Sequence, residues 1–160
     1  MSEAEVEIAW LGRQGDGIDA GATVFAARTL PGERIAGAPD ADGRIAAPRI
    51  LRPSADRVAA PCPAVRRCGG CALMHASDAF VAGWKRDRIA EALATRGLSA
   101  EIRETATSPA ASRRRAALSG RRGKSGATVG FHARRGEVVV DAAPCRVLVP
   151  TIVDALPALA

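Results

Sequence analysis

Four cysteines are the residues of this sequence whose type and spacing most directly point to chemistry. Cys62, Cys68 and Cys71 follow a C-x5-C-x2-C spacing, and Cys145 lies far from them in the sequence. The acidic N-terminus lacks a secretory signal, and outside oxidising compartments a C-x2-C pair more often binds metal than forms a disulfide. The glycines at 69–70 allow the positive φ of a tight turn and leave N–H groups free to point at sulfur. The spacing therefore predicts a metal site.

The cysteine pattern by itself leaves several kinds of site open. Four thiolates suit either tetrahedral zinc or an iron–sulfur cluster. Structural zinc sites usually combine two C-x2-C pairs, and this chain has one, which favours iron–sulfur. A local zinc site that uses His75 in place of Cys145 is an alternative. Four unrelated buried thiols are another, because free cysteine is a common core residue.

The distribution of charge points to a polyanionic partner. The chain has 23 basic and 17 acidic residues, a net charge of +6, and no acidic residue lies between positions 105 and 135. The remaining 15 basic and 17 acidic residues leave a net charge of −2. Such a concentrated basic stretch is typical of nucleic-acid binding. The candidate RNA-binding residues are Arg113, Arg114, Arg115, Arg121, Arg122, Lys124, Arg134 and Arg135.

Residues 1–57 show the pattern of short strands separated by turns. Val6, Ile8 and Trp10 alternate with more polar residues, which predicts a strand with these three side chains on its buried face. Turn sequences follow at 30–33 and 40–43. This spacing predicts a small barrel or sandwich.

The region after residue 57 is predicted to contain one principal helix and a β-meander. Ser77 is a suitable N-cap for a helix that runs to about Arg96, with Gly97 as its stop. From Arg113 the pattern returns to strands, with turns at 123–126 and 134–136. We therefore expect a mainly β protein with one principal helix, divided into residues 1–57 and 58–160.

Several segments, taken together, resemble the bacterial RNA (uracil-C5) methyltransferase family. The segment CPAVRRCGGCALMH at 62–75 is similar to the iron–sulfur signature of that family. The segments QGDG at 14–17 and TLPGE at 29–33 look like turns of its N-terminal TRAM domain. The segments VGFH at 129–132 and VDAAPC at 140–145 match the region that supplies the fourth cysteine. The resemblance extends over nearly the whole chain.

The resemblance implies a fold, a cofactor and a partner. It implies a five-strand OB-like TRAM barrel at 1–57, followed by an iron–sulfur segment and an incomplete central RNA-binding domain at 58–160. It also implies a 4Fe–4S cluster held by Cys62, Cys68, Cys71 and Cys145, with rRNA or tRNA as the partner in the cytoplasm. Departures occur at Ala72, Met74, Ser112 and Arg135-Gly136, which affect the expected details of RNA contact.

The chain is expected to lack catalytic activity by itself. Members of this family continue beyond the region that corresponds to Ala160 into an S-adenosylmethionine domain. Their chemistry requires a cysteine thiolate that attacks C6 of uracil, and four cluster ligands would leave no thiol for that attack. We assign no catalytic residue. The alternative is a free-standing, non-enzymatic RNA-binding module stapled by zinc or an iron–sulfur cluster.

Other patterns in the sequence are weak. The glycines at 15–21 resemble a dinucleotide loop, but no βαβ unit surrounds them. We expect structural roles for His75 and His132, and no serine has the matched partners of a catalytic triad. No apolar run reaches the length of a membrane span, and nothing indicates a protein partner.

Overall fold

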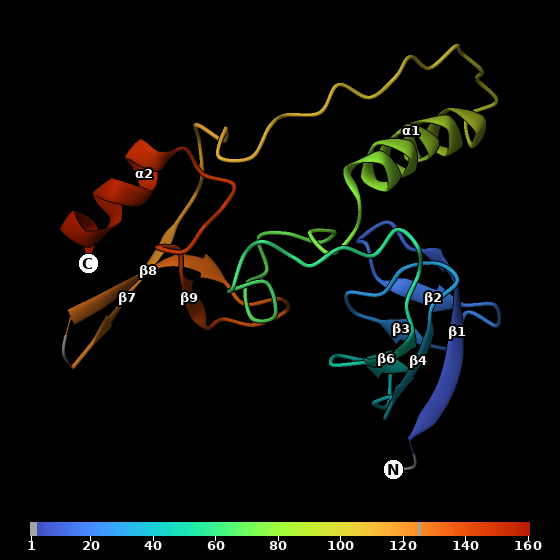
Figure 1. The fold of residues 1–160 in the computed structure, drawn as a ribbon, viewed down its shortest axis with the longest axis horizontal. Helices are drawn as coiled ribbons and strands as arrows, with labels where there is room; N and C mark the ends of the chain where they lie inside the picture. Colours follow the sequence, from blue (N-terminus) through green and yellow to red (C-terminus); the bar gives the residue numbers. More distant parts are fainter. Residues whose placement is uncertain (1–2, 125) are drawn as a thin grey trace. The chain divides into compact units, whose positions relative to one another are not determined.

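The computed structural model describes residues 3–124 and 126–160 and divides the chain into two compact units (Figure 1). Unit 1 contains Met1–Ala59 and His75–Ala106, and unit 2 contains Ala60–Met74 and Thr107–Ala160. The chain therefore leaves unit 1, contributes the segment with three cysteines to unit 2, and returns to unit 1. The division at residue 57 expected from the sequence stays a prediction.

Unit 1 is built around a curled, six-stranded sheet (Figure 1). The spatial order of its strands is β5-β3-β2-β1-β4-β6, and all neighbouring pairs are antiparallel except β3 and β5. Ile8, Val24, Ala26, Ile35 and Ile45 form the buried core between the curled strands. The strands are β1 (Ala4–Leu11), β2 (Gly17–Asp19), β3 (Phe25–Ala26), β4 (Arg34–Gly37), β5 (Arg44–Ile45) and β6 (Arg49–Arg52).

The first strand does not keep the simple alternation expected from the sequence. Ile8 is buried as predicted, but Trp10 is 43% exposed and Leu11 takes the buried position. The pairing of β1 with β2 shifts register between Ile8 and Trp10. A bulge inserts an extra residue and reverses which side chains face the core beyond it. The prediction that Trp10 faces the core is therefore wrong.

Helix α1 (Asp78–Ala94) follows the predicted bounds closely. The Ser77 side chain accepts a hydrogen bond of 3.2 Å from the Phe80 amide, which satisfies one of the free N–H groups of the first turn. At the other end, Gly97 has a φ of +66°, a conformation that glycine adopts without strain. None of the described residues of α1 is fully buried.

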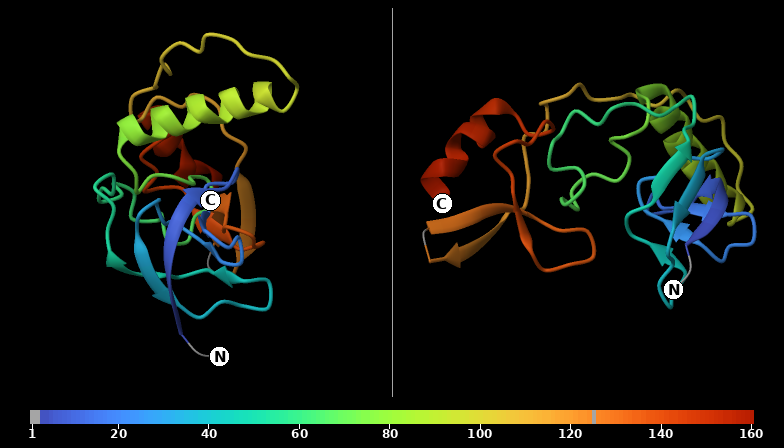
Figure 2. Two further views of the ribbon diagram at one scale, coloured as in Figure 1. Left: turned by 90° about the vertical axis from the view of Figure 1, so that its right-hand side faces the viewer. Right: turned by 60° about the horizontal axis from the view of Figure 1, so that its bottom comes forward.

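Unit 2 contains a three-stranded antiparallel meander, followed by the short helices α2 and η1. The C-terminal helical segment is red in Figure 2. The order β7-β8-β9 agrees with the predicted meander, and the C-terminal helix η1 contacts β8. Ser125, part of the predicted turn at 123–126, lies outside the described residues. The elements are β7 (Ser119–Gly123), β8 (Gly126–His132), β9 (Val139–Asp141), α2 (Pro150–Ala155) and η1 (Leu156–Leu159).

The expected class of fold is confirmed at the coarse level. The chain is mainly β with α1 as its one long helix. The five-strand OB-like barrel and the iron–sulfur segment stay predictions, since unit 1 holds a curled sheet of six strands. Within residues 3–124 and 126–160, no helix combines the length and the apolar character needed to cross a membrane.

Candidate functional site

The structure brings the four cysteines to one cavity inside unit 2. Cys62 is buried, while Cys68, Cys71 and Cys145 are half-buried, and all four thiols are free. Most of the remaining lining is apolar, with Arg113 and Asp141 as its charged members. The other lining residues are Ala64, Val65, Gly70, Met74, Phe131, Ala142, Val147 and Leu148.

Backbone hydrogen bonds fix the segments that carry these cysteines. The amide of Cys68 donates to the Ala64 carbonyl at 2.8 Å, which closes a turn after Cys62. The amide of Cys145 donates to the Ala142 carbonyl at 2.9 Å, which closes a turn just after β9. Cys68 also forms an isolated antiparallel bridge with Ala133. The first cysteine segment is therefore attached directly to the meander that leads to the fourth cysteine.

Of the two glycines between Cys68 and Cys71, close packing requires Gly69, and neither is required by a positive φ. Both lie outside the left-handed region, so the conformational reason expected from the sequence is wrong. A Cβ on Gly69 would lie 2.8 Å from the carbonyl oxygen of His132, whereas one on Gly70 would lie 3.5 Å from the Phe131 ring, an ordinary van der Waals contact. The amide of Gly70 points at the Cys68 sulfur at 3.4 Å, as predicted.

The pKa of the Cys71 thiol depends on the charges of the other three cysteines. Burial raises the pKa of the Cys71 thiol, and the negative charges of Cys68, Cys145 and Cys62 raise it further. The guanidinium of Arg113 opposes these effects by lowering the same pKa. A bound cation or a cationic metal cluster is what would allow several thiolates to coexist in such a cavity.

The described residues show no preformed ligand set for a metal ion, and the kind of metal centre stays a prediction. Among the described residues, no group of three or more histidine, cysteine, aspartate or glutamate side chains converges closely enough to hold one metal ion. Tetrahedral zinc needs all four sulfurs about 2.3 Å from one point, whereas an iron–sulfur cluster spreads its thiolates around a larger core. His75 is not among the residues that line the cavity.

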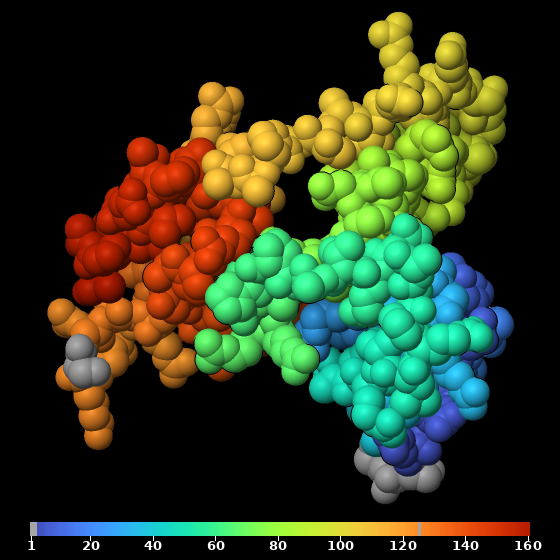
Figure 3. Space-filling view, in the orientation of Figure 1, coloured from blue at the N-terminus to red at the C-terminus, as the bar shows by residue number. Residues whose placement is uncertain are grey.

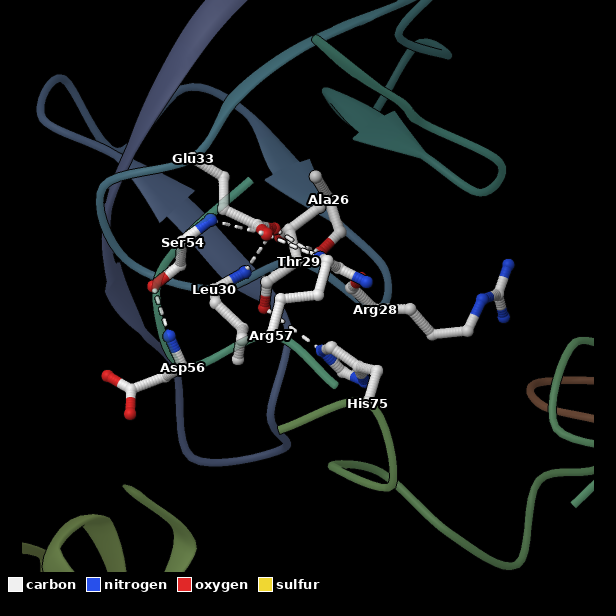
Figure 4. A network of polar contacts seen from close by, with 9 residues as sticks. All are labelled: Ala26, Arg28, Thr29, Leu30, Glu33, Ser54, Asp56, Arg57 and His75. Carbon is white, nitrogen blue, oxygen red and sulfur yellow. Dashed lines mark hydrogen bonds and ion pairs between the residues drawn. The ribbon is translucent and has the colours of Figure 1, made fainter. Parts of the chain in front are cut away.

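His75 instead belongs to a buried polar network in unit 1 (Figure 4). Its Nε2 lies 3.4 Å from the carbonyl oxygen of Thr29, and its Nδ1 has no hydrogen-bond partner among the described residues. Burial lowers the pKa of His75, and the nearby positive charges of Arg57 and Arg28 add to this effect, whereas Thr29 and Glu33 oppose it. The expectation of a structural role is consistent with this placement.

Glu33 and Arg57 form the charged centre of this network (Figure 4). Glu33 accepts hydrogen bonds from Arg57, from the Leu30 amide at 2.8 Å and from the Ser54 amide at 3.1 Å. Burial raises the pKa of Glu33, but these hydrogen bonds and the charge of Arg57 outweigh burial and hold the pKa below its ordinary value. The carboxylate is therefore ionised and fully satisfied.

All eight predicted RNA-binding residues lie in unit 2, although not in the arrangement expected from the sequence. The residues at 113–115 precede β7, and only Arg113 forms a bridge, with Leu148. The expectation that strands begin at Arg113 is therefore wrong for these three residues, since β7 begins at Ser119. Arg121 and Arg122 are exposed on β7, and Lys124 is exposed just after it. The β7–β8 end of unit 2, orange in Figure 3, projects into solvent.

The structure also pairs two residues that the sequence analysis left apart. Ser119 on β7 lies with its Oγ 2.8 Å from Nε2 of His132 on β8. Ser119 stands opposite Gly130 in the hairpin register, so His132 is its diagonal neighbour. No pattern within either segment indicated this pair, because it depends on the register between β7 and β8.

Comparison with known proteins identifies the relatives of the chain. A protein of Caulobacter vibrioides described as an uncharacterized RNA methyltransferase is 42% identical over 156 residues, which cover 94% of this chain and 37% of the relative. The 23S rRNA (uracil(1939)-C(5))-methyltransferase RlmD of Thiobacillus denitrificans is 37% identical over 111 residues, 64% of this chain and 25% of that protein. The chain is related to RNA methyltransferases. The resemblance stated from the sequence is thereby confirmed.

The chain spans less than two-fifths of the length of these relatives. The crystal structure of a Pyrococcus abyssi tRNA (uracil-54, C5)-methyltransferase in complex with S-adenosyl-L-homocysteine has a similar fold. Its TM-score is 0.68 at 22% identity, over 97% of this chain and 35% of that one. No family model matches the sequence.

Proposed function

We propose that this chain is the RNA-recognising, cluster-bearing N-terminal portion of an S-adenosylmethionine-dependent RNA (uracil-C5) methyltransferase of the cytoplasm. In the full-length protein it would take part in the formation of 5-methyluridine in rRNA or tRNA. One observation carries the proposal, namely the convergence of four cysteines on one apolar cavity in a chain whose relatives are RNA methyltransferases.

Cys62, Cys68, Cys71 and Cys145 are the proposed ligands of a 4Fe–4S cluster. The cavity supports this assignment because it supplies four thiols, an apolar wall and an N–H group directed at the Cys68 sulfur. Such N–H groups orient ligands and tune metal sites. A cluster at this position would cross-link the segment at 62–71 to the loop that carries Cys145 and so reduce the entropy of the unfolded chain.

The exposed basic residues of unit 2 are the proposed contacts with RNA phosphates. Arg121, Arg122 and Lys124 are exposed at one end of the meander, and Arg114 and Arg115 are exposed before it. Exposed guanidinium groups form bidentate hydrogen bonds with phosphate oxygens. The absence of acidic residues between 105 and 135 leaves these charges without competing carboxylates in the same stretch.

The 160-residue chain by itself is proposed to be inert as a methyltransferase. All four of its cysteines are assigned to the cluster, so no thiol is left to attack C6 of uracil. Incubation of the purified chain with S-adenosylmethionine and uridine-containing RNA should leave the RNA unmethylated. Methyl transfer by this chain would contradict the assignment of its cysteines.

Anaerobic purification followed by visible spectroscopy and metal analysis tests the cluster. We expect a broad brown absorbance with about four iron and four sulfide ions per chain. Cys145→Ser should lose the cluster, whereas Arg146→Ala, a change at the adjacent exposed residue, should retain it. His75→Gln should also retain it. Stoichiometric zinc that survives Cys145→Ser but is lost in His75→Gln would overturn the proposal in favour of a local zinc site.

Binding of single-stranded RNA at several salt concentrations tests the basic surface. We expect affinity to fall with salt, with a log–log slope of about −0.7 for each phosphate contact. Arg121→Gln with Arg122→Gln should weaken binding and flatten that slope. Arg34→Gln, a matched change of an exposed arginine in unit 1, should alter neither quantity. Binding without salt dependence would contradict the proposed phosphate contacts.

A further inference from the structure

The groups around Ser119 and His132 determine which of the two residues donates the hydrogen bond between them. Nδ1 of His132 lies 3.3 Å from the carbonyl oxygen of Glu137, and a carbonyl oxygen can only accept a hydrogen bond. Nδ1 therefore carries the proton of the neutral ring, and Nε2 is left as an acceptor. At 2.8 Å from Nε2, the hydroxyl of Ser119 must be the donor.

This assignment determines what kind of group Ser119 can bind. A hydroxyl has one proton, and the proton of Ser119 is already donated to His132. Only the lone pairs of its Oγ are available to a further partner. That partner must bring a donor, so a phosphate oxygen, which only accepts, does not fit.

The pair lies on the open face of the three-stranded meander. Directly paired residues share a face, which places Ser119, Arg121, Thr128 and His132 on one side of the sheet, together with Val139 and Asp141 of β9. The Asp141 carboxylate accepts a hydrogen bond of 2.9 Å from the Ala143 amide. Phe131 points to the other side, where it lines the cysteine cavity. Thr128, Arg121 and His132 are exposed, and Ser119 is half-buried. A ligand can therefore reach Ser119 from solvent.

Arg121 supplies a complementary contact close by. It is two residues from Ser119 on the same face of β7, a separation of about 7 Å along a strand. The guanidinium of Arg121 donates hydrogen bonds and therefore binds an acceptor, whereas the Oγ of Ser119 binds a group that donates a hydrogen bond. A ribose with its adjacent phosphate carries both groups, in the form of the 2′-hydroxyl and the phosphate oxygens.

Resting on the proposed function of RNA binding, we propose that Ser119 accepts a hydrogen bond from the 2′-hydroxyl of a bound ribose. Arg121 holds the neighbouring phosphate, and His132 acts as a positioning residue that keeps the Ser119 proton turned away from the ligand. Since DNA lacks the 2′-hydroxyl, this site distinguishes RNA from DNA. The distinction does not depend on the identity of the base.

Three oligonucleotides that share the base uracil test the proposal on the purified chain at pH 8. They are an oligouridylate about ten nucleotides long, its 2′-deoxy form and its 2′-O-methyl form. Wild-type protein should bind oligouridylate most tightly. Ser119→Ala should weaken that binding about three- to tenfold, the range for a neutral hydrogen bond, and leave the deoxy and methyl forms unchanged. Thr128→Ala, on the same face, is the matched control and should change none of the three affinities.

Two further variants separate the roles of the neighbouring residues. His132→Ala should reduce the preference for oligouridylate by less than Ser119→Ala, because Oγ can still accept a hydrogen bond, and the double variant should lose no more than Ser119→Ala alone. Arg121→Gln should weaken the binding of all three oligonucleotides about equally. It should also reduce the salt slope by about 0.7, as expected for one phosphate contact.

The following results would overturn the proposed contact between Ser119 and the 2′-hydroxyl. Equal affinity of wild-type protein for the ribose and deoxyribose forms would exclude a 2′-hydroxyl site. An equal loss on all three oligonucleotides in Ser119→Ala would assign the residue to a base contact or to folding. Salt-dependent RNA binding that Ser119→Ala leaves unchanged would defeat this inference alone. Absence of RNA binding in the wild-type chain would defeat the proposed function with it.

Discussion

Arg57 donates hydrogen bonds to both carboxylate oxygens of Glu33, and the Glu33 side chain is completely buried. The two residues are 24 positions apart, so the pair fastens the end of β6 and the following segment to the turn before β4. A charge removed from water in this way depends on its partner, since an unpaired buried charge is costly.

Glu33→Gln should destabilise unit 1 by about 3 kcal/mol, because it leaves the partly buried Arg57 without its counter-ion. Denaturant unfolding monitored by circular dichroism measures the effect. Glu5→Gln is the matched control, since Glu5 pairs with Arg34 at 2.7 Å on the surface, with both side chains more than half exposed. It should cost less than about 1 kcal/mol. Equal effects of the two variants would contradict the stated role of the buried pair.

His75 should make the stability of the protein fall as the solution becomes mildly acidic. Burial lowers the pKa of His75 in the folded state, so the unfolded state takes up a proton first as pH falls through about 6.5. Stability is then lost toward acid by at most about 1.4 kcal/mol per pH unit. Unfolding measured at intervals from pH 7.5 to about pH 5.5 should show this slope. An unchanged slope in His75→Gln would assign the dependence to other groups.

Glu33 should make a separate contribution to the pH dependence of stability in acid. Its pKa is lowered in the folded state, so its stabilising effect is present above the ordinary value near 4.5 and is lost as pH falls through the folded pKa. Glu33→Gln should therefore flatten the stability curve below about pH 4.5 and leave its shape near neutrality unchanged. A variant that still shows the wild-type loss of stability below this pH would contradict the assignment.

Gly83→Ala should stabilise the protein by roughly 1 kcal/mol, since glycine in the middle of a helix carries an entropic cost and no described atom lies within 4 Å of the added methyl. Thermal unfolding measures the gain. Gly97→Ala is the opposing control, because the φ of +66° at Gly97 strains any residue with a side chain. It should lower stability.

Gly69→Ala should disrupt the cysteine cavity, because the new methyl group would meet the carbonyl oxygen of His132 and the amide of Arg134 at about 3 Å. We expect loss of bound iron together with lower stability of unit 2. Gly120→Ala on β7 serves as the control, since open space surrounds its Cβ position within the described residues. Full iron content in Gly69→Ala would show that the tight contact is not needed for the cluster.

The features that the sequence predicted well are those determined by local rules. Ser77 and Gly97 mark the two ends of α1. Both could be predicted because capping and a left-handed glycine after the helix depend on residues within a few positions of the helix ends. The turn at 40–43 closes as expected, with the Gly43 amide donating to the Asp40 carbonyl at 3.0 Å. The four cysteines line one cavity, and their assignment as metal ligands stays a prediction.

The features that the sequence predicted poorly depend on contacts between distant strands. The bulge that exposes Trp10 arises from the pairing of β1 with β2, which no pattern within β1 reveals. Ser119 and His132 are 13 positions apart and meet only through the register of the hairpin. Arg113 bonds to the segment before α2 instead of to a neighbouring strand of the meander. Each of these required knowledge of pairing partners.

The segment with three cysteines enters unit 2 from the middle of unit 1, which gives the synthesis of the site a definite order. Cys71 leaves the ribosome well before Cys145, with 73 residues between them. At about 5–20 residues per second, that interval lasts roughly 4–15 s. During translation a nascent chain therefore presents an incomplete set of thiols for several seconds. If the proposed cluster is bound, its delivery would come late, after the meander has emerged.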